Sequence, residues 1–472
     1  MEMFSEYPAV SAWEVLDTAA NAAERLQWAL RKKRGCILLP WTHPAALPDF
    51  MPPFDWERTP SGRFPPGKQL LFRLLQRAPR FDPRHPIPGE EVRSLVVFRY
   101  DAIGDYLVTT PLLRWLRQGL PQARLCVVTS TRNDGLVGQD PCVDEHVPLH
   151  PMHGVHPSWV RAIVRLRGPH QVVYALVFTH MSKAAFLARS IAPEAEYIAP
   201  RHWERAYLYG LVFHRQPEHC PWRQHWAQTL LQIGCRTLAP CVPVEPSPRL
   251  HVPVSAEACE RVWSELERRG LGTVPPLGLP VPARGSSPLR WEPVEGMPYA
   301  VVNLSAYSKN RRWAVHHALV VCRELLRRIP GIALVVTAAP QQRRQVETLV
   351  QAVRDSRCRA FQGSLSELIA LVAGAAWVLS PDTSVVHLAS ALGKPVVALY
   401  SELIKVAEWY PFGVPSVCVL SPLWGGVTFV PPAAIVEAVE RLVQEVIPAG
   451  AVIPPVPLPS GGALSGSATG KC

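Results

Sequence analysis

A chain of 472 residues exceeds one ordinary core and suits two domains of roughly 150 residues each, with additional segments. Hydrophobic residues make up 48% and charged residues 18%, which is typical of a globular protein, and no apolar run reaches the roughly 18 residues that span a membrane. The net charge of +11 favours an anionic partner such as a nucleotide, a nucleic acid or an anionic lipid.

The N-terminal sequence and the cysteines indicate the compartment. The first residues, "MEMFSEYPAV", are acidic and lack the basic start and apolar centre of a secretory signal, so we expect a cytoplasmic protein. The 11 cysteines are odd in number and form no CxxC pair. This pattern favours reduced, packed thiols over a disulfide framework or a zinc site.

Residues 1–91 are expected to form an N-terminal extension with two amphipathic helices, over residues 12–34 and 67–77, and a Pro-rich stretch between them. Both helix-like pieces are basic towards their ends. One interpretation is that they cover a core, as most amphipathic helices do. The other is that they dock on an anionic membrane face, with inserting side chains from Trp13, Trp28, Leu70, Leu71 and Phe72.

Short apolar runs then alternate with longer helical stretches. Runs that are apolar throughout belong to strands covered on both faces, as in a parallel, doubly wound sheet. We predict strands over residues 94–100, 123–130, 144–149, 174–180 and 195–200, and helices over 106–120, 156–167, 183–191 and 225–234. This α/β series predicts one Rossmann-like domain over residues 92–236.

A second alternating series follows a Pro-rich segment, residues 237–297, which we interpret as a linker or insertion with one helix over 255–270. The second series predicts another Rossmann-like domain over residues 298–447. Its expected strands are 299–305, 332–339, 358–363, 375–381 and 395–401, and its expected helices are 316–330, 341–353, 366–374, 384–393 and 432–446. Residues 448–472 lack the apolar content to order themselves and are expected to be a flexible tail.

Gly104 and Asp105 follow the first strand of the first series, at the start of a helix. Ligands of doubly wound folds bind beyond the carboxyl ends of the strands, which makes residues at such positions candidates for chemistry. Gly104 permits a tight turn or the close approach of a ligand. The spacing of Asp105 is that of a simple helix cap, and a catalytic role is the alternative.

Asp382, Thr383 and Ser384 occupy a similar strand-to-helix junction in the second series. The side chains and free N–H groups at such a junction form a natural phosphate site. His387 lies three residues after Ser384, so both fall on one face of the helix. The alternatives are that Asp382 or Thr383 only caps the helix and that His387 is a core histidine.

Lys309, Arg311 and Arg312 lie in the loop "AYSKNRRW", after the first strand of the second series. Cations at this place would neutralise a diphosphate leaving group. The alternative is that they are solvated surface side chains.

These stretches resemble glycosyltransferase family 9, the ADP-heptose:lipopolysaccharide heptosyltransferases. "VVFRYDAIGDYLVTTPLLRWLRQGLPQARLCVVT" resembles the opening motif of the family, and "SPDTSVVHLASALGKPVVALYS" resembles its second signature. The resemblance covers about residues 92–236 and 298–444.

The resemblance implies a GT-B fold, in which two Rossmann-like domains face a central cleft. The acceptor would lie on the N-terminal domain and the nucleotide sugar mainly on the C-terminal one. The aspartate of the Gly-Asp step is the general base in this family, which here is Asp105. Inversion at the anomeric carbon would follow from a single displacement.

The resemblance also implies the residues that bind the donor. Arg311, two residues before Trp313, falls where the family usually has a phosphate-binding lysine, and Lys309 is the second candidate. Thr383 and Ser384 would hold the diphosphate, while Asp382 and His387 would contact donor sugar or phosphate. No metal and no cofactor are expected, because basic residues and a helix N-terminus can take the diphosphate charge.

Three features depart from the family pattern, one of which is that "YALVFTHMSKAAF" lacks the usual acidic residue after its strand. Ser384 replaces a glycine, and Gln342 stands where an acidic residue often helps to hold the nucleoside. The leading hypothesis is an inverting glycosyltransferase that moves heptose, or a related sugar, from an ADP-sugar to a glycolipid or saccharide acceptor, at the cytoplasmic face of the inner membrane. The alternatives are a different donor sugar and a non-catalytic nucleotide-sugar-binding protein. No nucleic-acid-binding motif accompanies the basic residues, which argues against nucleic acid as a partner.

Overall fold

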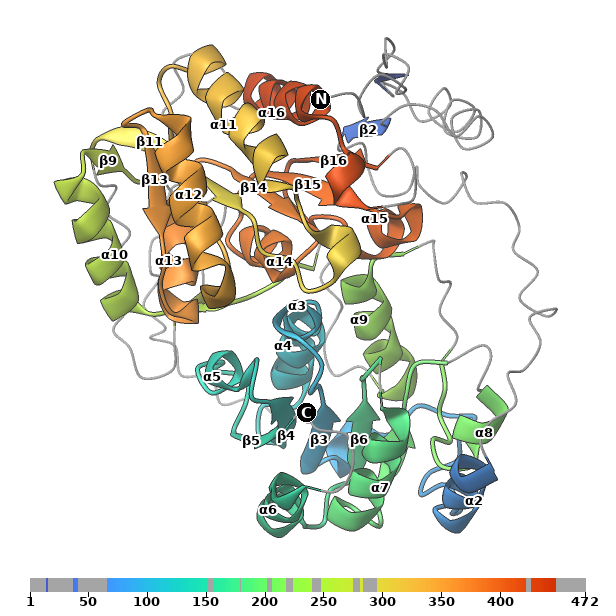
Figure 1. Cartoon of the computed structure of the whole chain (residues 1–472). Coiled ribbons are helices and arrows are strands. Elements are labelled where there is room, and N and C mark those ends of the chain that lie inside the picture. Colours follow the sequence, from blue (N-terminus) through green and yellow to red (C-terminus); the bar gives the residue numbers. More distant parts are fainter. Residues whose placement is uncertain are drawn as a thin grey trace, which may run out of the picture.

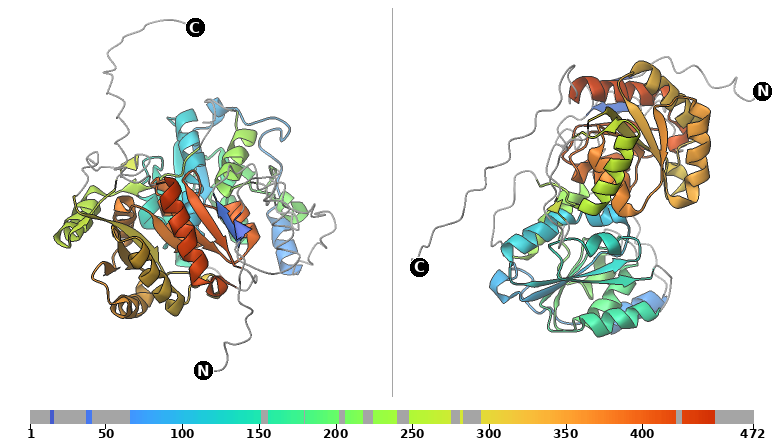
Figure 2. Two further views of the ribbon diagram at one scale, coloured as in Figure 1. Left: turned by 90° about the horizontal axis from the view of Figure 1, so that it is seen from above. Right: turned by 90° about the vertical axis from the view of Figure 1, so that its left-hand side faces the viewer.

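Two largely parallel sheets, each covered by helices on both faces, dominate the described part of the chain (Figures 1 and 2). The computed structural model describes residues 14–15, 37–40, 66–150, 156–178, 180–201, 206–217, 224–239, 248–274, 281–282, 295–421 and 426–446.

The first sheet has five parallel strands among the described residues, in the order β5-β4-β3-β6-β7. This order places the first strand in the centre and is that of a Rossmann-like sheet. The strands are β3 (Ser94–Phe98), β4 (Arg124–Ser130), β5 (Glu145–Leu149), β6 (Val172–Ala175) and β7 (Glu196–Ile198).

Helices cover both faces of this sheet, because alternate strand residues such as Val96 and Val97 point into two separate apolar cores. One core includes α3 (Ile103–Leu107), α4 (Thr110–Gly119), α5 (Asp134–Val137) and α9 (Trp226–Thr237). The other includes α2 (Pro66–Leu74), α6 (Pro157–Leu166), α7 (Met181–Ile191) and α8 (Ala206–Gly210).

The second sheet repeats the order of the first around β11 and β14, and nine of its strands are described. Its parallel strands are β11 (Met297–Asn303), β12 (Ala333–Thr337), β13 (Cys358–Phe361), β14 (Val378–Pro381), β15 (Val396–Tyr400), β16 (Ser416–Leu420) and the short β9 (Leu271–Gly272), which pairs with β11. Strands β8 (Pro253–Val254) and β10 (Val281–Pro282) form a separate pair.

Two groups of helices cover the second sheet. One face carries α11 (Val315–Arg328), α12 (Arg343–Val353) and α16 (Pro432–Val446). The face towards the first sheet carries α10 (Ala256–Arg268), α13 (Leu365–Gly374), α14 (Ser384–Ala391) and α15 (Leu403–Trp409). The short 3-10 helices are η4 (Gly89–Glu91), η6 (Lys309–Arg311), η7 (Pro340–Gln342) and η8 (Val427–Phe429).

One apolar core is continuous between the two sheets. It contains Leu107 and Leu113 from the first series and Val385 and Leu388 from the second. Helices α3 and α14 are therefore in direct contact at the centre of the molecule (Figure 1).

The beginning of the chain adds strands to the second sheet. Strand β2 (Ile37–Pro40) pairs antiparallel with β16 and parallel with β1 (Glu14–Val15). The prediction of a helix over residues 12–34 is therefore wrong at Glu14–Val15, where the backbone pairs with β2. The rest of that range, including Trp13 and Trp28, lies outside the described residues.

The second predicted helix of the extension is present as α2. Phe72 is fully buried, and its ring centroid lies 5.2 Å from that of Tyr209. The prediction that Phe72 could insert into a membrane is therefore wrong, because this side chain packs into the first domain's core. Leu70, by contrast, is exposed and Leu71 is partly exposed.

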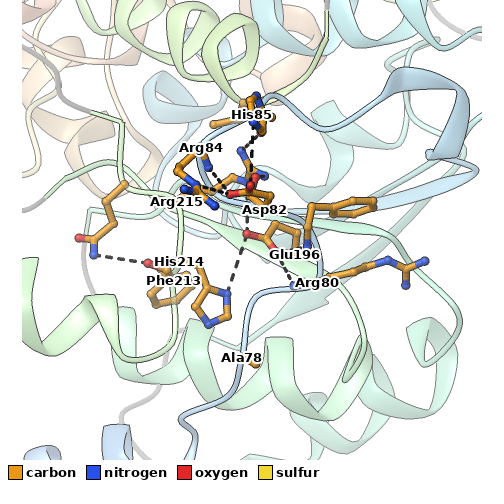
Figure 3. Close-up of polar contacts among 12 residues, drawn as sticks. Ala78, Arg80, Asp82, Arg84, His85, Glu196, Phe213, His214 and Arg215 are labelled. Atoms are coloured by element: carbon orange, nitrogen blue, oxygen red, sulfur yellow. Dashed lines mark hydrogen bonds and ion pairs between the residues drawn. The ribbon is translucent and has the colours of Figure 1, made fainter.

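The segment after α2 is tied to the edge of the first sheet by the buried carboxylate of Glu196 (Figure 3). Its Oε2 accepts a hydrogen bond from the backbone N–H of Arg80 at 2.8 Å, and its Oε1 lies 3.2 Å from Nε of Arg215. Arg215 also donates to the carbonyl oxygens of Asp82, at 2.8 Å, and His85, at 2.6 Å. The described end of the extension is thus part of the first domain's structure.

Part of the segment expected to be a linker packs on the second sheet. Nε1 of Trp263 in α10 donates to the carbonyl oxygen of Ala370 in α13 at 3.0 Å, and β9 pairs with β11. The domain boundaries taken from the sequence stay predictions. The tail, residues 448–472, lies outside the described residues.

Candidate active site

Each sheet has a switch point, where the chain turns from one side of its first strand to the other. In the first sheet this point lies between β3 and β6, and in the second it lies between β11 and β14. Ligands of doubly wound sheets bind at this point, beyond the carboxyl ends of the strands. The candidate residues from the sequence follow β3, β11 and β14, so all of them lie at switch points.

Gly104 in α3 and His387 in α14 bring the two switch points together. A Cβ atom on Gly104 would lie 2.9 Å from Cδ2 of His387 and 3.6 Å from Cα of Ser384. Gly104 is not among the glycines with positive φ, so its role is to permit close approach and not to form a turn. Two motifs that are far apart in the sequence therefore lie side by side in the structure.

Asp105 lies in the first turn of α3 with a side chain that is 18% exposed. Its Oδ2 accepts a hydrogen bond from the backbone N–H of Ala102 at 2.9 Å, so Asp105 does cap its helix. Its Oδ1 lies 3.9 Å from Nη2 of Arg99. Burial raises the pKa of Asp105, and the charge of Arg99 opposes that rise. The cap occupies one carboxylate oxygen and leaves the other for a second partner.

Thr383 is the N-cap of α14, as its position in the sequence suggests. Its Oγ1 accepts hydrogen bonds from the backbone N–H of Val385 at 3.4 Å and from Nδ2 of Asn303 at 3.2 Å. Asn303 ends β11 and also donates to Oγ of Ser380 at 2.9 Å. This network fixes the strand-to-helix junction, and Ser384, the first residue of α14, is partly exposed beside Gly104.

Asp382 and Arg311 form a pair at the same junction. Nε of Arg311 lies 3.4 Å from Oδ2 of Asp382, and its Nη1 donates to the carbonyl oxygen of Asp382 at 3.3 Å. Burial raises the pKa of Asp382, and the charge of Arg311 opposes that rise. Lys309 is exposed and makes no ion pair with the described residues. Of the two predicted phosphate ligands, the structure therefore brings only Arg311 into contact with the junction.

His387 is buried in the first turns of α14. Burial, together with the charge of Arg311, lowers its pKa to about 4, so the imidazole is neutral at pH 7. Its Nδ1 has no hydrogen-bond partner among the described residues, although buried polar atoms usually have one. His387 is thus a buried histidine, as the structural interpretation held, and its buried Nδ1 has no partner among the described residues.

Aromatic side chains around His387 join the two halves of the molecule. The ring centroid of Trp409 lies 5.8 Å from that of His387 and 5.5 Å from that of Phe178. His225 stacks on Phe412 with ring centroids 4.6 Å apart. We call Phe178, His225, Trp226, Trp409 and Phe412 the aromatic seam.

Sequence reasoning missed several residues of this site. Burial raises the pKa of both Asp105 and Asp382, and the charge of Lys405 in α15 opposes that rise at both carboxyls. Lys405 thus acts on both halves, but nothing in its sequence context indicates this. Asn303 carried a readable signal, because it is a polar residue at the end of an apolar strand.

Gln342 lies at the end of η7, directly before α12, where it is partly exposed and its Nε2 donates to Oε1 of Gln345 at 3.1 Å. In the described part of the chain, no group of three His, Cys, Asp or Glu side chains is arranged to hold a metal ion. Within the same residues, no helix has both the length and the apolar content needed to cross a membrane.

Comparison with protein families supports the interpretation of the second half. Glycosyltransferase family 9 (heptosyltransferase) matches residues 273–430. The resemblance to this family is confirmed. The matched residues include Arg311, Asp382 and His387, and the match supports a glycosyltransferase. No curated protein matches the sequence.

Three solved structures confirm the predicted GT-B fold. A glycosyl transferase family 9 protein from Veillonella parvula DSM 2008 is 16% identical, with a TM-score of 0.58 over 75% of this chain and 97% of its own. ADP-heptose lps heptosyltransferase II of E. coli is 15% identical, with a TM-score of 0.54 over 75% of this chain and 99% of its own. E. coli heptosyltransferase WaaC with ADP-2-deoxy-2-fluoro heptose is 15% identical, with a TM-score of 0.53 and the same coverages of 75% and 99%.

Proposed function

We propose that this chain is an inverting, metal-independent glycosyltransferase that moves heptose, or a related sugar, from an ADP-sugar to a saccharide acceptor in the assembly of lipopolysaccharide core or another surface glycan. The contact of Gly104 with His387 carries this proposal. It brings Asp105 next to the strand-to-helix junction at residues 382–384, which belongs to the stretch that resembles the second family signature. The solved neighbour with ADP-2-deoxy-2-fluoro heptose supports an ADP-sugar as the donor.

In the proposed reaction, the free Oδ1 of Asp105 accepts the proton of an acceptor hydroxyl. The hydroxyl oxygen attacks the anomeric carbon of the donor sugar from the side opposite the leaving group. The bond between that carbon and the diphosphate oxygen breaks, and ADP leaves with the bonding electrons. This single displacement inverts the configuration, and general-base catalysis of this kind contributes typically about 100-fold or more to the rate.

The charge of the leaving ADP would be taken by Arg311, by Lys309 and by the N-terminus of α14. Arg311 is 33% exposed on its side chain, so it can exchange part of its contact with Asp382 for a phosphate oxygen. The backbone N–H groups after Thr383 face the same junction. The neutral imidazole of His387 would contact donor sugar or phosphate.

A donor screen with purified protein tests the proposal. We expect calorimetry to detect tighter binding of ADP-sugars than of GDP-, UDP- or dTDP-sugars, and we expect release of ADP when a saccharide acceptor is added. Preference for a UDP-sugar would overturn the donor assignment. Binding of ADP-heptose with no turnover on any acceptor would instead identify a non-catalytic nucleotide-sugar-binding protein.

We also propose peripheral contact with an anionic membrane at the cytoplasmic face, because the acceptor of such a reaction is lipid-linked. Helices α6, α7 and α2 lie side by side and contain no Asp or Glu (Figure 1). Leu70 and Leu74 of α2 are exposed next to Lys68 and Arg73. Charge reversal of Lys68 and Arg73 should weaken co-sedimentation with phosphatidylglycerol vesicles at low salt and leave ADP binding unchanged. Unchanged co-sedimentation would remove α2 from the contact.

A further inference from the structure

Arg99 follows β3 directly, and its guanidinium is fully buried beside Asp105. Its Nε donates to the carbonyl oxygen of Asp105 at 2.7 Å, and its Nη1 donates to the carbonyl oxygen of Leu176, beyond β6. The guanidinium also lies over the ring of Phe178, 4.5 Å from the centroid. Arg99 therefore links the first turn of α3 to the end of β6 and to the aromatic seam.

The charge of Arg99 is shared between two carboxylates. Nη1 lies 3.4 Å from Oδ2 of Asp101, and Nη2 lies 3.9 Å from Oδ1 of Asp105. Nη2 has no hydrogen-bond partner among the described residues, although it is buried. A buried guanidinium is costly unless its charge and donors are used, so its retention at this place needs an explanation.

We propose that Arg99 is the positioning residue of Asp105: it fixes the helix turn through the Asp105 carbonyl and supplies the positive charge opposite the free carboxylate oxygen. This inference rests on the proposed role of Asp105 as the general base. A base must be ionised when it meets the acceptor hydroxyl, and a carboxylate buried at a domain interface tends to hold its proton. Arg99 counteracts that tendency without contacting the substrate.

The charges around Asp105 give the direction of the effect. Burial raises the pKa of Asp105, Arg99 opposes that rise, Asp101 adds to it, and the N–H of Ala102 and the charge of Lys405 oppose it. From α14, the facing titratable group is His387, which is neutral at pH 7. Loss of the Arg99 charge therefore raises the pKa of Asp105, and loss of the Asp101 charge lowers it.

The test measures the titration of the Asp105 carboxyl directly, by NMR of protein made with isotope-labelled aspartate. The resonance of Asp105 is identified by its loss in Asp105→Asn. We expect Arg99→Met to move the titration midpoint up by about one unit or more, and Asp101→Asn to move it down. Arg99→Lys keeps the charge but not the fork, so its midpoint should stay closer to that of the wild type.

The same variants have a kinetic readout. The acid limb of kcat/KM should follow the midpoint, to higher pH in Arg99→Met and to lower pH in Asp101→Asn. Arg99→Lys should lower kcat at all pH values, because a lysine cannot hold the carbonyl oxygens of Asp105 and Leu176 together. Wild-type kcat in Arg99→Lys would overturn the positioning part of the proposal.

Arg117→Met is the matched control. Arg117 also holds backbone carbonyl oxygens, those of Ala123 at 2.9 Å and Cys142 at 2.9 Å, but its charge does not act on Asp105. It should leave the midpoint unchanged. Asp101→Asn keeps every donor of Arg99 in place, so the test does not depend on the folding of Arg99→Met.

Unchanged midpoints in both Arg99→Met and Asp101→Asn would overturn the inference. That result is separable from failure of the proposed function, which would appear as normal turnover in Asp105→Asn. A shifted midpoint together with an active Asp105→Asn protein would leave Arg99 acting on a carboxylate that is not the base, and would also overturn the inference.

Discussion

The two switch points carry the same pair of charges in different environments. At the first, Asp105 faces Arg99, whose guanidinium is fully buried and held by backbone carbonyl oxygens. At the second, Asp382 faces Arg311, which belongs to a 3-10 turn and is 33% exposed on its side chain. The first arginine is fixed and reaches only protein atoms, whereas the second is able to meet a ligand. This difference is the basis of our proposal that the first pair serves a base and the second serves an anion.

The largest predicted effect is a loss of transfer rate at Asp105, and its absence would contradict the role of the first pair. Asp105→Asn should keep the fold and ADP binding but lower the transfer rate about 100-fold or more, because an amide cannot accept the acceptor's proton. Steady-state kinetics with a saccharide acceptor measures the effect. Asp144→Asn, a carboxylate of the same domain that pairs with Arg117, should be neutral. Turnover near that of the wild type in folded Asp105→Asn would make Asp105 a helix cap only.

The second half of the comparison is tested at Arg311. Arg311→Ala should weaken ADP binding by about 1.5 to 3 kcal/mol, since a charge-assisted contact to phosphate is lost. Lys309→Ala should have a smaller effect, because Lys309 is exposed, and Arg312→Ala, exposed on the same loop, is the control. Calorimetry measures all three variants. Equal affinity in Arg311→Ala and the wild type would remove this loop from the site.

The smallest predicted effect is a loss of stability at Gly104, where the two switch points meet. Gly104→Ala places a Cβ 2.9 Å from Cδ2 of His387, so the imidazole or one of the two helices must shift. Overpacking costs about 1 to 3 kcal/mol, which the better helix propensity of alanine offsets by about 1 kcal/mol. Thermal unfolding should therefore show a net loss of about 1 kcal/mol, together with slower transfer.

Gly135→Ala is the control for that substitution, because a Cβ at this helical position meets nothing within 4 Å and should be neutral or stabilising. In a protein that already carries His387→Ala, Gly104→Ala should cost no stability, because the ring that its Cβ would meet is gone. Additive losses in the double variant would show that the two residues do not meet.

Local patterns in the sequence were enough to predict the two Rossmann-like series. Apolar runs such as "SLVVF" and "ALVVT" form buried central strands because nothing but apolar surface surrounds them. The places of Gly104, Asp105 and Thr383 at strand-to-helix junctions followed from the same alternation. Elements that depend on distant partners could not be predicted, as at Glu14–Val15, whose strand exists only through pairing with β2.

The arrangement of the site was less accessible than its members. The contact of Gly104 with His387 depends on how two domains pack, which no local pattern encodes. Lys405 lies in an ordinary helix, and Arg99 falls near the end of the predicted strand 94–100. Both residues act through their charge on buried carboxyl groups. This effect depends on distances in the folded chain, which the sequence does not give.

The pairing of β2 with β16 has a consequence for the order in which the molecule assembles. During synthesis, Ile37–Pro40 leaves the ribosome long before Ser416–Leu420 exists, so the edge of the second sheet closes only when nearly all of the chain is available. Contacts of such large sequence separation form late, and an apolar edge segment that waits for its partner is prone to pair wrongly. Chaperone dependence during translation should therefore fall when β2 is supplied after β16, as in a circularly permuted chain.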